Sequence, residues 1–287
     1  MSGTQLRGAM VALAPAALIV VMLVAGGVAV ALVQALSPAG GRDGVVTLAH
    51  FRAVLSEPGF LSGLLLTLWV SFVSTVVTVL LAIVTALSLR RMRRLQRLMT
   101  YVYQLPLTLP HLVLASAGIM LLSQSGVLSR AVTALGLISS PSGFPELVYD
   151  RGGIGIIAVY VWKQVPFVGL FALAVLQSVG EDYEAAARSL GARPFQAVRH
   201  VLVPLIVPGL LPASVIIFAF VFGAFEVPLL LGARYPSMLS VLAYRLYTDV
   251  DLSLRPQSMA LSFVIALIIF VLIGIYRLVT ATVGRRS

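Results

Sequence analysis

Long apolar stretches separated by short polar segments dominate the chain. Six of these stretches reach the roughly 20 residues that a helix needs to cross the hydrocarbon core of a bilayer, and they comprise residues 11–36, 61–89, 101–122, 154–179, 205–231 and 258–279. Because lipid offers no partner to backbone N–H and C=O groups, each stretch is expected to be an α-helix. The pattern predicts an all-α membrane protein with six transmembrane helices. The first apolar run exceeds the roughly 7–15 residues of a signal-peptide core, so we expect it to be retained.

The polar segment of residues 180–209, between the fourth and fifth predicted spans, has the local chemistry of a short helix exposed to water. Ser178 and Glu181 have the spacing of a capping box, which predicts a helix start. Glu184 stands four residues before Arg188, an arrangement that supports an exposed helix by roughly 0.2–0.5 kcal/mol. These charges predict a helix that begins near residue 181.

The same segment also predicts where this helix ends and which face it offers to a partner. Gly191 can adopt the left-handed conformation that terminates a helix, and Pro194 follows three residues later. Steps of three and four residues place one aromatic and several small or apolar side chains on a single face. The residues of this face are Tyr183, Ala186, Ala187 and Leu190. Such a face is suited to a groove in another protein.

Composition excludes a soluble globular protein and several kinds of active site. Of the 287 residues, 60% are hydrophobic and 10% are charged, whereas an ordinary soluble domain has roughly 25% charged residues. The chain has no cysteine, and its three histidines are scattered, so neither a disulfide framework nor a metal site is expected. No glycine-rich phosphate loop occurs. We therefore predict no catalytic residues, no cofactor and no enzymatic activity in this chain.

The arginines predict how the chain is oriented in the membrane. Six spans place both termini and residues 180–209 on one side, and that side carries Arg7, Arg90, Arg91, Arg93, Arg94, Arg97, Arg188, Arg193, Arg199, Arg277, Arg285 and Arg286. The opposite side carries fewer, namely Arg42, Arg52, Arg130, Arg151, Arg234, Arg245 and Arg255. The positive-inside rule makes the richer side cytoplasmic. It also explains the net charge of +10 without a nucleic-acid partner.

Two ionisable side chains lie within predicted spans, Lys163 in the fourth and Glu226 in the fifth. Each costs roughly 2.5–3.5 kcal/mol at the centre of a membrane helix, so each is a candidate functional residue. One interpretation has Glu226 line a solute pathway with Lys163 as its partner or as a gate. The other places them near the interface or pairs them within the bundle. Prolines either open the helices around a cavity or only kink them for packing, and they are Pro106, Pro110, Pro166, Pro204, Pro208, Pro212 and Pro228.

Two connections on the opposite side of the membrane also carry structural signals. Residues 125–138 have apolar positions that suit a short helix lying on the outer surface, although an unstructured loop remains the alternative. Residues 232–257 carry charges that either meet an external partner or are simply solvated.

One spacing within residues 180–209 resembles a known family motif. Gly191 is followed by nine residues and then by the sequence VLVP at residues 201–204. This resembles the EAA loop of permease subunits of ATP-binding-cassette importers, whose pattern is Glu-Ala-Ala, three residues, Gly, nine residues and Ile-x-Leu-Pro. The sixth residue before Gly191 is Ala185, so Glu184 stands one position earlier than the motif glutamate.

The resemblance implies a type I importer in the cytoplasmic (inner) membrane of a bacterium. It implies an N-terminal span and outer loop (1–60), a permease domain (61–277) and a cytoplasmic tail (278–287). The implied partners are two ATPase subunits carrying Mg-ATP, a second permease subunit, an extracytoplasmic solute-binding protein and the lipid bilayer. Closure of the ATPases would move the coupling (EAA) helix and switch the pathway between inward-facing and outward-facing states. The residues expected to couple to the ATPase are Tyr183, Glu184, Ala185, Ala186, Ala187, Leu190, Gly191 and Pro204.

The substrate expectation rests on the same resemblance. The stretches WKQVPF, GAFEVPLLLG and DVDLSLRPQSMALS are similar to the spermidine/putrescine-like group of permeases, which includes phosphonate and ferric-ion relatives. Glu226 in a pathway suits a cation such as a polyamine, whereas Lys163 suits an anion such as an aminoalkylphosphonate. An ion-coupled secondary transporter that uses these two charges is the alternative of another class.

Overall fold

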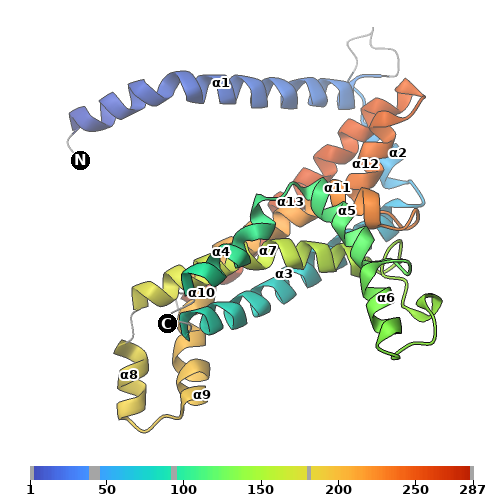
Figure 1. The fold of residues 1–287 in the computed structure, drawn as a ribbon. Helices are drawn as coiled ribbons and strands as arrows, with labels where there is room; N and C mark the ends of the chain where they lie inside the picture. The colour runs from blue at the N-terminus through green and yellow to red at the C-terminus, as the bar shows by residue number, and fades with distance from the viewer. Residues whose placement is uncertain (1–2, 39–45, 92–95, 180–181, 285–287) are drawn as a thin grey trace. The chain divides into compact units, whose positions relative to one another are not determined.

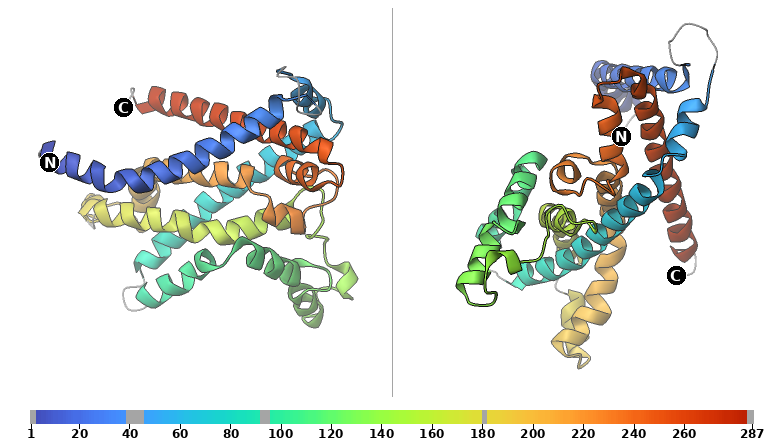
Figure 2. Two further views of the ribbon diagram at one scale, coloured as in Figure 1. Left: turned by 90° about the horizontal axis from the view of Figure 1, so that it is seen from above. Right: turned by 90° about the vertical axis from the view of Figure 1, so that its right-hand side faces the viewer.

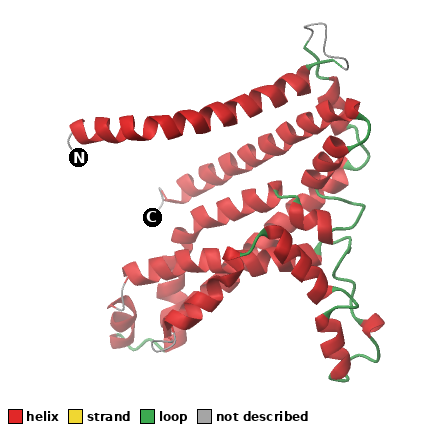
Figure 3. Cartoon of the chain, turned by 45° about the horizontal axis from the view of Figure 1, so that its top comes forward, coloured by secondary structure: helices red, strands yellow, loops and turns green. Residues whose placement is uncertain are grey.

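The computed structural model describes residues 3–38, 46–91, 96–179 and 182–284, and its described regular elements are all helical (Figures 1 and 3). The α-helices are α1 Gly3–Leu36, α2 Ala49–Leu55, α3 Phe60–Arg91, α4 Gln96–Thr108, α5 His111–Leu122, α6 Val127–Ala134, α7 Ile154–Val179, α8 Asp182–Ser189, α9 Pro194–Ala197, α10 Val203–Gly223, α11 Glu226–Leu231, α12 Leu239–Thr248 and α13 Arg255–Gly284. Short 3-10 turns occupy Pro141–Gly143 and Leu252–Leu254, and a π-helical turn at Val198–Leu202 joins α9 to α10. The all-α fold is confirmed, as is the short helix expected within residues 125–138.

Six helical stretches of the described chain are long and apolar enough to cross a membrane. They are Leu13–Leu36, Phe60–Arg90, His111–Ala134, Ile154–Ser178, Pro194–Gly223 and Leu252–Tyr276. Their number agrees with the prediction of six spans. The boundaries of the third and fifth stretches differ most from it, and in each case a helix break next to a proline divides the predicted span.

The third predicted span, residues 101–122, is not one helix. It is divided between α4, which ends at Thr108, and α5, which begins at His111. Pro110 has no backbone N–H to continue the ladder, and its ring disfavours the helical conformation at Leu109. Sequence reasoning recognised the proline but treated the apolar run as continuous.

The fifth predicted span, residues 205–231, is divided as well. A continuous helix would place the ring of Pro228 against the carbonyl of Ala224, four residues earlier. The chain instead leaves α10 after Gly223 with Ala224 in an extended conformation, and Glu226 begins the separate helix α11. The prediction that Glu226 lies inside a continuous fifth span is therefore wrong.

The chain forms two compact units. The first combines Met1–Phe60 with Leu242–Ile268, and the second combines Leu61–Val241 with Ile269–Ser287. Within the first unit, the hydroxyl of Ser258 donates a hydrogen bond to the carbonyl of Ala243 at 2.7 Å. This bond joins the start of α13 to α12. The expected division into 1–60, 61–277 and 278–287 stays a prediction.

Helix α7 is the centre of the second unit. It packs against α4, α5, α10 and α11, and Figure 2 shows α4 and α5 lying beside it. The hydroxyl of Tyr103 in α4 donates to the carbonyl of Val165 in α7 at 2.7 Å and shares a second hydrogen bond of 2.8 Å with Thr85 in α3. A Cβ atom at Gly169 would lie 2.0 Å from this tyrosine oxygen. Glycine therefore permits the close approach of α4 to α7.

The second unit has two clusters of buried apolar side chains. One lies where the C-terminal halves of α3 and α7 meet α10 and the turn before it, and it includes Ala86, Leu176, Leu202 and Ile206. The other joins α3, α5, α7, α10 and α11 and includes Tyr160. The first cluster anchors the segment that follows α8, and the second surrounds the ionisable residues predicted to line a pathway.

Candidate functional site

Helix α8 forms within the polar segment where a docking helix was predicted, but its start differs from the prediction. Ser178 lies inside α7, where its hydroxyl donates to the carbonyl of Val175 at 2.8 Å. A residue inside one helix cannot be the N-cap of the next, so the predicted capping box is wrong. Its second member, Glu181, lies outside the described residues. The helix itself begins at Asp182.

The end of α8 confirms the prediction at Gly191. This glycine has a φ of +85°, and its N–H donates to the carbonyl of Arg188 at 2.9 Å. The N–H of Ala192 donates to the carbonyl of Ala187 at 3.0 Å. These two bonds form a Schellman motif, which satisfies carbonyls at the end of the helix and requires the left-handed conformation that glycine adopts without steric cost.

The apolar face of α8 is open to solvent in this chain. Tyr183 is 55% exposed and Leu190 is 90% exposed, while Ala186 is exposed and Ala187 is half-buried between them. Ala185 is also exposed but lies on the other side of the helix. A face of this kind, on a helix at the start of a polar segment, is available to another protein.

Glu184 points toward its own chain. Its carboxylate accepts a hydrogen bond from Arg188 at 2.6 Å and lies 3.3 Å from the guanidinium of Arg90 at the end of α3. The Glu184 and Arg90 side chains are each only 19% exposed. The predicted pair with Arg188 is confirmed, and the contact with Arg90 is a finding that sequence spacing could not provide. Through Glu184, α8 is tied to α3.

The connection from α8 into the membrane is short and well packed. After α9, the π-helical turn Val198–Leu202 leads directly into α10, which has Pro204 in its first turn. Pro204 is itself exposed, but Leu202 and Ile206 on either side of it are fully buried in the core. Buried side chains on either side of Pro204 therefore fix the connection between α8 and α10 in the core.

Lys163 binds backbone carbonyls at a helix break and does not pair with another described side chain. It is 8% exposed, and its ammonium group donates to the carbonyl of Pro106 at 3.3 Å and to that of Leu109 at 2.5 Å. Pro110 has no N–H to offer the Pro106 carbonyl, four residues earlier. The ammonium takes the place of that missing donor, which is a physical reason for a charge inside the predicted fourth span.

Glu226 is half-buried at the first position of α11. It does not form an ion pair with Lys163, although both residues are described. Each of the two charges is within electrostatic range of His111 in α5. Glu226 also acts on Tyr160 in α7. Three helices therefore place ionisable groups around one region.

Two aromatic contacts complete this region. The ring of Phe220 in α10 lies 4.9 Å from that of His111 and 6.4 Å from that of Tyr160, measured between centroids. We call His111, Tyr160, Lys163, Phe220 and Glu226 the polar cluster. Sequence reasoning found its two charges and dismissed His111 as scattered, because the meeting of α5, α7, α10 and α11 is not visible in sequence spacing.

A row of hydroxyl groups on α3 was also missed. Thr67, Ser71, Ser74 and Thr78 follow one another at steps of three and four residues and are all buried. The hydroxyls of Ser71, Ser74 and Thr78 have no hydrogen-bond partner among the described residues, and neither has that of Tyr160. Buried polar atoms without partners are costly, so these groups mark places that suit water or a polar solute.

Among the described residues, no group of three or more His, Asp and Glu side chains is placed to hold a metal ion. The described part of the chain combines an exposed short helix, α8, with a polar region among its apolar helices.

Two curated proteins are similar over about half of this chain. The inner membrane ABC transporter permease protein YdcU of Escherichia coli (strain K12) is 32% identical over 134 residues, which cover 45% of this chain and 43% of that protein. The molybdenum transport system permease protein ModB of Azotobacter vinelandii is 28% identical over 150 residues, which cover 52% of this chain and 62% of that protein. The matched segments thus span less than two thirds of either relative.

The fold is similar to that of a chain in the crystal structure of a bacterial alginate ABC transporter in complex with an alginate pentasaccharide-bound periplasmic protein. The TM-score is 0.77, and the match covers 95% of this chain and 93% of that one at 19% identity, so it shows the fold alone. Residues 78–286 match the family described as binding-protein-dependent transport system inner membrane component. Since this match takes in well over half of the sequence, the chain belongs to that family of inner membrane transport components.

Proposed function

We propose that this chain is one permease subunit of an ATP-driven importer. A second permease subunit encloses the pathway with it, two ATPase subunits dock beneath, and a solute-binding protein delivers the substrate from outside. Members of the family lack a nucleotide-binding domain, and partner ATPases bind and hydrolyse the ATP. The chain is accordingly a transport subunit and not an enzyme.

One observation, the structure of helix α8, supports this proposal more strongly than any other. Helix α8 has an exposed apolar face, a Schellman end at Gly191 and a buried anchor in α10. The exposed face includes Tyr183 and Leu190, which together offer an aromatic and an aliphatic group to a cleft. An ion-coupled carrier has no need of such a helix.

In this function, α8 is the coupling helix and lies on the cytoplasmic side with both termini. Closure of the ATPases draws it along, and the motion reaches the membrane helices by two routes. One route is the ion pair between Glu184 and Arg90, which leads to α3. The other is the π-helical turn into α10. Both routes end in the same buried cluster, so α3 and α10 move together.

A bulky residue on the apolar face of α8 tests this function. Ala186→Trp should hinder seating of α8 in the ATPase cleft, because overpacking costs about 1–3 kcal/mol, which is roughly 5- to 150-fold in affinity. The measurement is ATP hydrolysis by the reconstituted complex in the presence of its binding protein. Ser189→Trp, which lies outside the apolar face, is the matched control. Normal stimulation with Ala186→Trp in a correctly assembled complex contradicts the proposed docking.

For the substrate, we propose a polyamine or a similar small cation that uses Glu226 as its counter-charge. The Lys163 ammonium is engaged by the carbonyls of Pro106 and Leu109, while Glu226 has no ion pair with another described residue. A carboxylate in the polar cluster therefore suits a cationic solute better than an anionic one. An aminoalkylphosphonate or ferric ion is the alternative, and the named relatives of this family import different substrates, including molybdenum and maltose.

Neutralising Glu226 tests the substrate proposal. Glu226→Gln keeps the size of the side chain and removes its charge, so transport of radiolabelled spermidine into proteoliposomes should fall about tenfold, the equivalent of roughly 1.4 kcal/mol. Glu146→Gln, an exposed position in the loop before α7, serves as the control. If Glu226→Gln transports spermidine at the wild-type rate and half-saturating concentration, the counter-charge role is excluded.

A further inference from the structure

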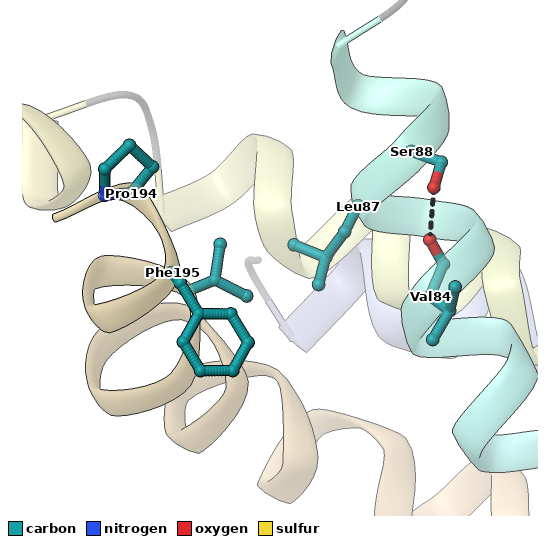
Figure 4. Close-up of a pocket in the computed structure, with 6 residues that line it drawn as sticks. Val84, Leu87, Ser88, Pro194 and Phe195 are labelled. Carbon is teal, nitrogen blue, oxygen red and sulfur yellow. Dashed lines mark hydrogen bonds between the residues drawn. The ribbon is translucent and has the colours of Figure 1, made fainter.

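An apolar groove lies between the end of α3 and the segment that follows α8. It has a volume of about 410 Å³ and is lined by Val84, Leu87, Ser88, Pro194, Phe195 and Val198. Figure 4 shows Leu87 and Phe195 facing each other across it, from α3 and α9 respectively. The volume lies within the roughly 300–1,000 Å³ of small-molecule sites.

The lining of this groove suits a hydrocarbon chain. Its only side-chain hydroxyl belongs to Ser88 and is already used, because it donates to the carbonyl of Val84 at 2.8 Å (Figure 4). Phe195 is 71% exposed, although an aromatic ring of that size gains from leaving water. The groove therefore offers apolar contact and no polar group that would recognise a polar solute.

Cationic side chains flank the groove. Arg193 stands immediately before Pro194, and Arg199 immediately after Val198; both are exposed, and neither forms an ion pair with another described residue. At the α3 side, Arg90 follows the last lining residue, Ser88, by two positions, and its guanidinium is paired with Glu184. Apolar lining residues are thus next to basic residues in the sequence on both sides of the groove.

An apolar groove with neighbouring cations matches one kind of molecule. An anionic phospholipid carries both a hydrocarbon chain and a phosphate, and basic pockets between membrane helices on the cytoplasmic side bind such headgroups. We propose that this groove binds an anionic phospholipid of the cytoplasmic leaflet, with an acyl chain against Leu87 and Phe195 and its phosphate at Arg193 and Arg199.

Because of where the groove lies, a lipid bound in it also affects how α8 is joined to the membrane helices. Its two walls are α3 and the α9 segment, which are the two elements through which α8 is joined to the membrane helices. A lipid lodged between them fills the space that would otherwise let the walls shift separately. This role rests on the proposed function, whereas lipid binding itself does not.

Lipid retention by the assembled transporter tests the proposal. The purified complex is exposed to a mixture of phosphatidylglycerol and phosphatidylcholine in detergent, and bound lipid is measured by native mass spectrometry. Wild type should retain phosphatidylglycerol preferentially. Replacing both arginines (Arg193→Gln with Arg199→Gln) should reduce that retention roughly fivefold for each arginine, since a basic residue near an anionic membrane contributes about 1 kcal/mol.

A second pair of variants tests the groove without changing charge. Val84→Trp fills the groove and should reduce retention of both lipids, whereas Leu80→Trp, one turn earlier on α3 and outside the groove, should leave it unchanged. Equal retention of the two lipids by wild type, or unaltered retention in Val84→Trp, overturns the proposal.

Labelling then identifies any other occupant. The chain has no native cysteine, so Phe195→Cys provides a single thiol at the groove. Phosphatidylglycerol in nanodiscs should slow its reaction with a maleimide more than phosphatidylcholine does. Crosslinking of this thiol to a second permease or an ATPase, with no effect of lipid, assigns the groove to a protein and overturns the proposal. These readouts need no transport, so their failure is distinguishable from failure of the proposed function.

Discussion

At the scale of single residues, side chains from other helices replace the donors that two prolines remove. Pro110 leaves the carbonyl of Pro106 without its helical partner, and the ammonium of Lys163 binds there. In the same way, Pro228 has no N–H for the carbonyl of Ala224, and the hydroxyl of Ser240 donates to it at 2.8 Å. Inside a membrane an unsatisfied carbonyl cannot turn to water. These two contacts therefore allow the helix breaks around the polar cluster.

This account predicts a rescue of Lys163 variants. Lys163→Met leaves two carbonyls without a donor and should destabilise the chain by about 1–3 kcal/mol, while Lys163→Arg, which keeps the donors, should cost less. Adding Pro110→Ala to Lys163→Met restores an N–H near the Pro106 carbonyl and should recover part of the loss. The measurement is the thermal denaturation midpoint of the complex in detergent. Additive effects of the two substitutions would falsify the proposed relation between them.

At the scale of elements, α8, the proposed coupling helix, is held by contacts that differ from those expected of an EAA loop. The resemblance assigns the motif glutamate to the ATPase, yet Glu184 is turned toward Arg90 of its own α3. The shift of this glutamate by one position, seen in the sequence, rotates it by about 100° around a helix. In the proposed function, the apolar face of α8, and not Glu184, meets the ATPase.

A double-mutant cycle between α8 and α3 separates these two roles. If Glu184 acts through Arg90, then Glu184→Gln and Arg90→Gln should each weaken stimulation of the ATPase, and the double variant should be no worse than either. Residues in one salt-bridge network show coupling energies of about 0.5–3 kcal/mol. The ratio of stimulated to basal ATP hydrolysis is the measurement. A much larger effect of Glu184→Gln that adds to that of Arg90→Gln would instead indicate a direct contact with the ATPase.

At the scale of the whole molecule, the described chain leaves several polar groups without partners. The hydroxyls of Ser71, Ser74 and Thr78 on α3 and that of Tyr160 on α7 are buried and unbonded among the described residues. A single permease subunit encloses only part of a pathway in the proposed assembly. Apolar residues of similar size would fill the same positions without the free-energy cost of burying an unpaired hydroxyl. Contact with water or solute that passes between two such subunits is a reason for a membrane protein to keep these hydroxyls.

Much of the site on α8 could be predicted from sequence, because its signals are local. The helix end at Gly191, the pair of Glu184 with Arg188 and the apolar face all depend on residues within one or two turns. The capping box failed for a related reason. Ser178 has the right spacing, but the preceding helix α7 continues through it, and spacing alone does not say where one helix stops.

The polar cluster could be predicted only in part. The cost of a charge among apolar residues singled out Lys163 and Glu226, because that cost depends on local composition. Their partners depend on which helices meet. His111 and Tyr160 come from helices that are distant along the chain, and the break before α11 moved Glu226 out of a continuous span.

The sequence by itself determined the helical class, the number of long apolar helices and the short exposed helix that ends before Gly191, since apolar length and local capping chemistry act over short distances along the chain. Only the tertiary structure decided what the charges bind. It joined Glu184 to Arg90 and Lys163 to the carbonyls at the α4–α5 break, and it formed the groove between α3 and α9. The physical reason is that hydrogen bonds, ion pairs and packing act between atoms close in space, and closeness in space between helices is set by the fold.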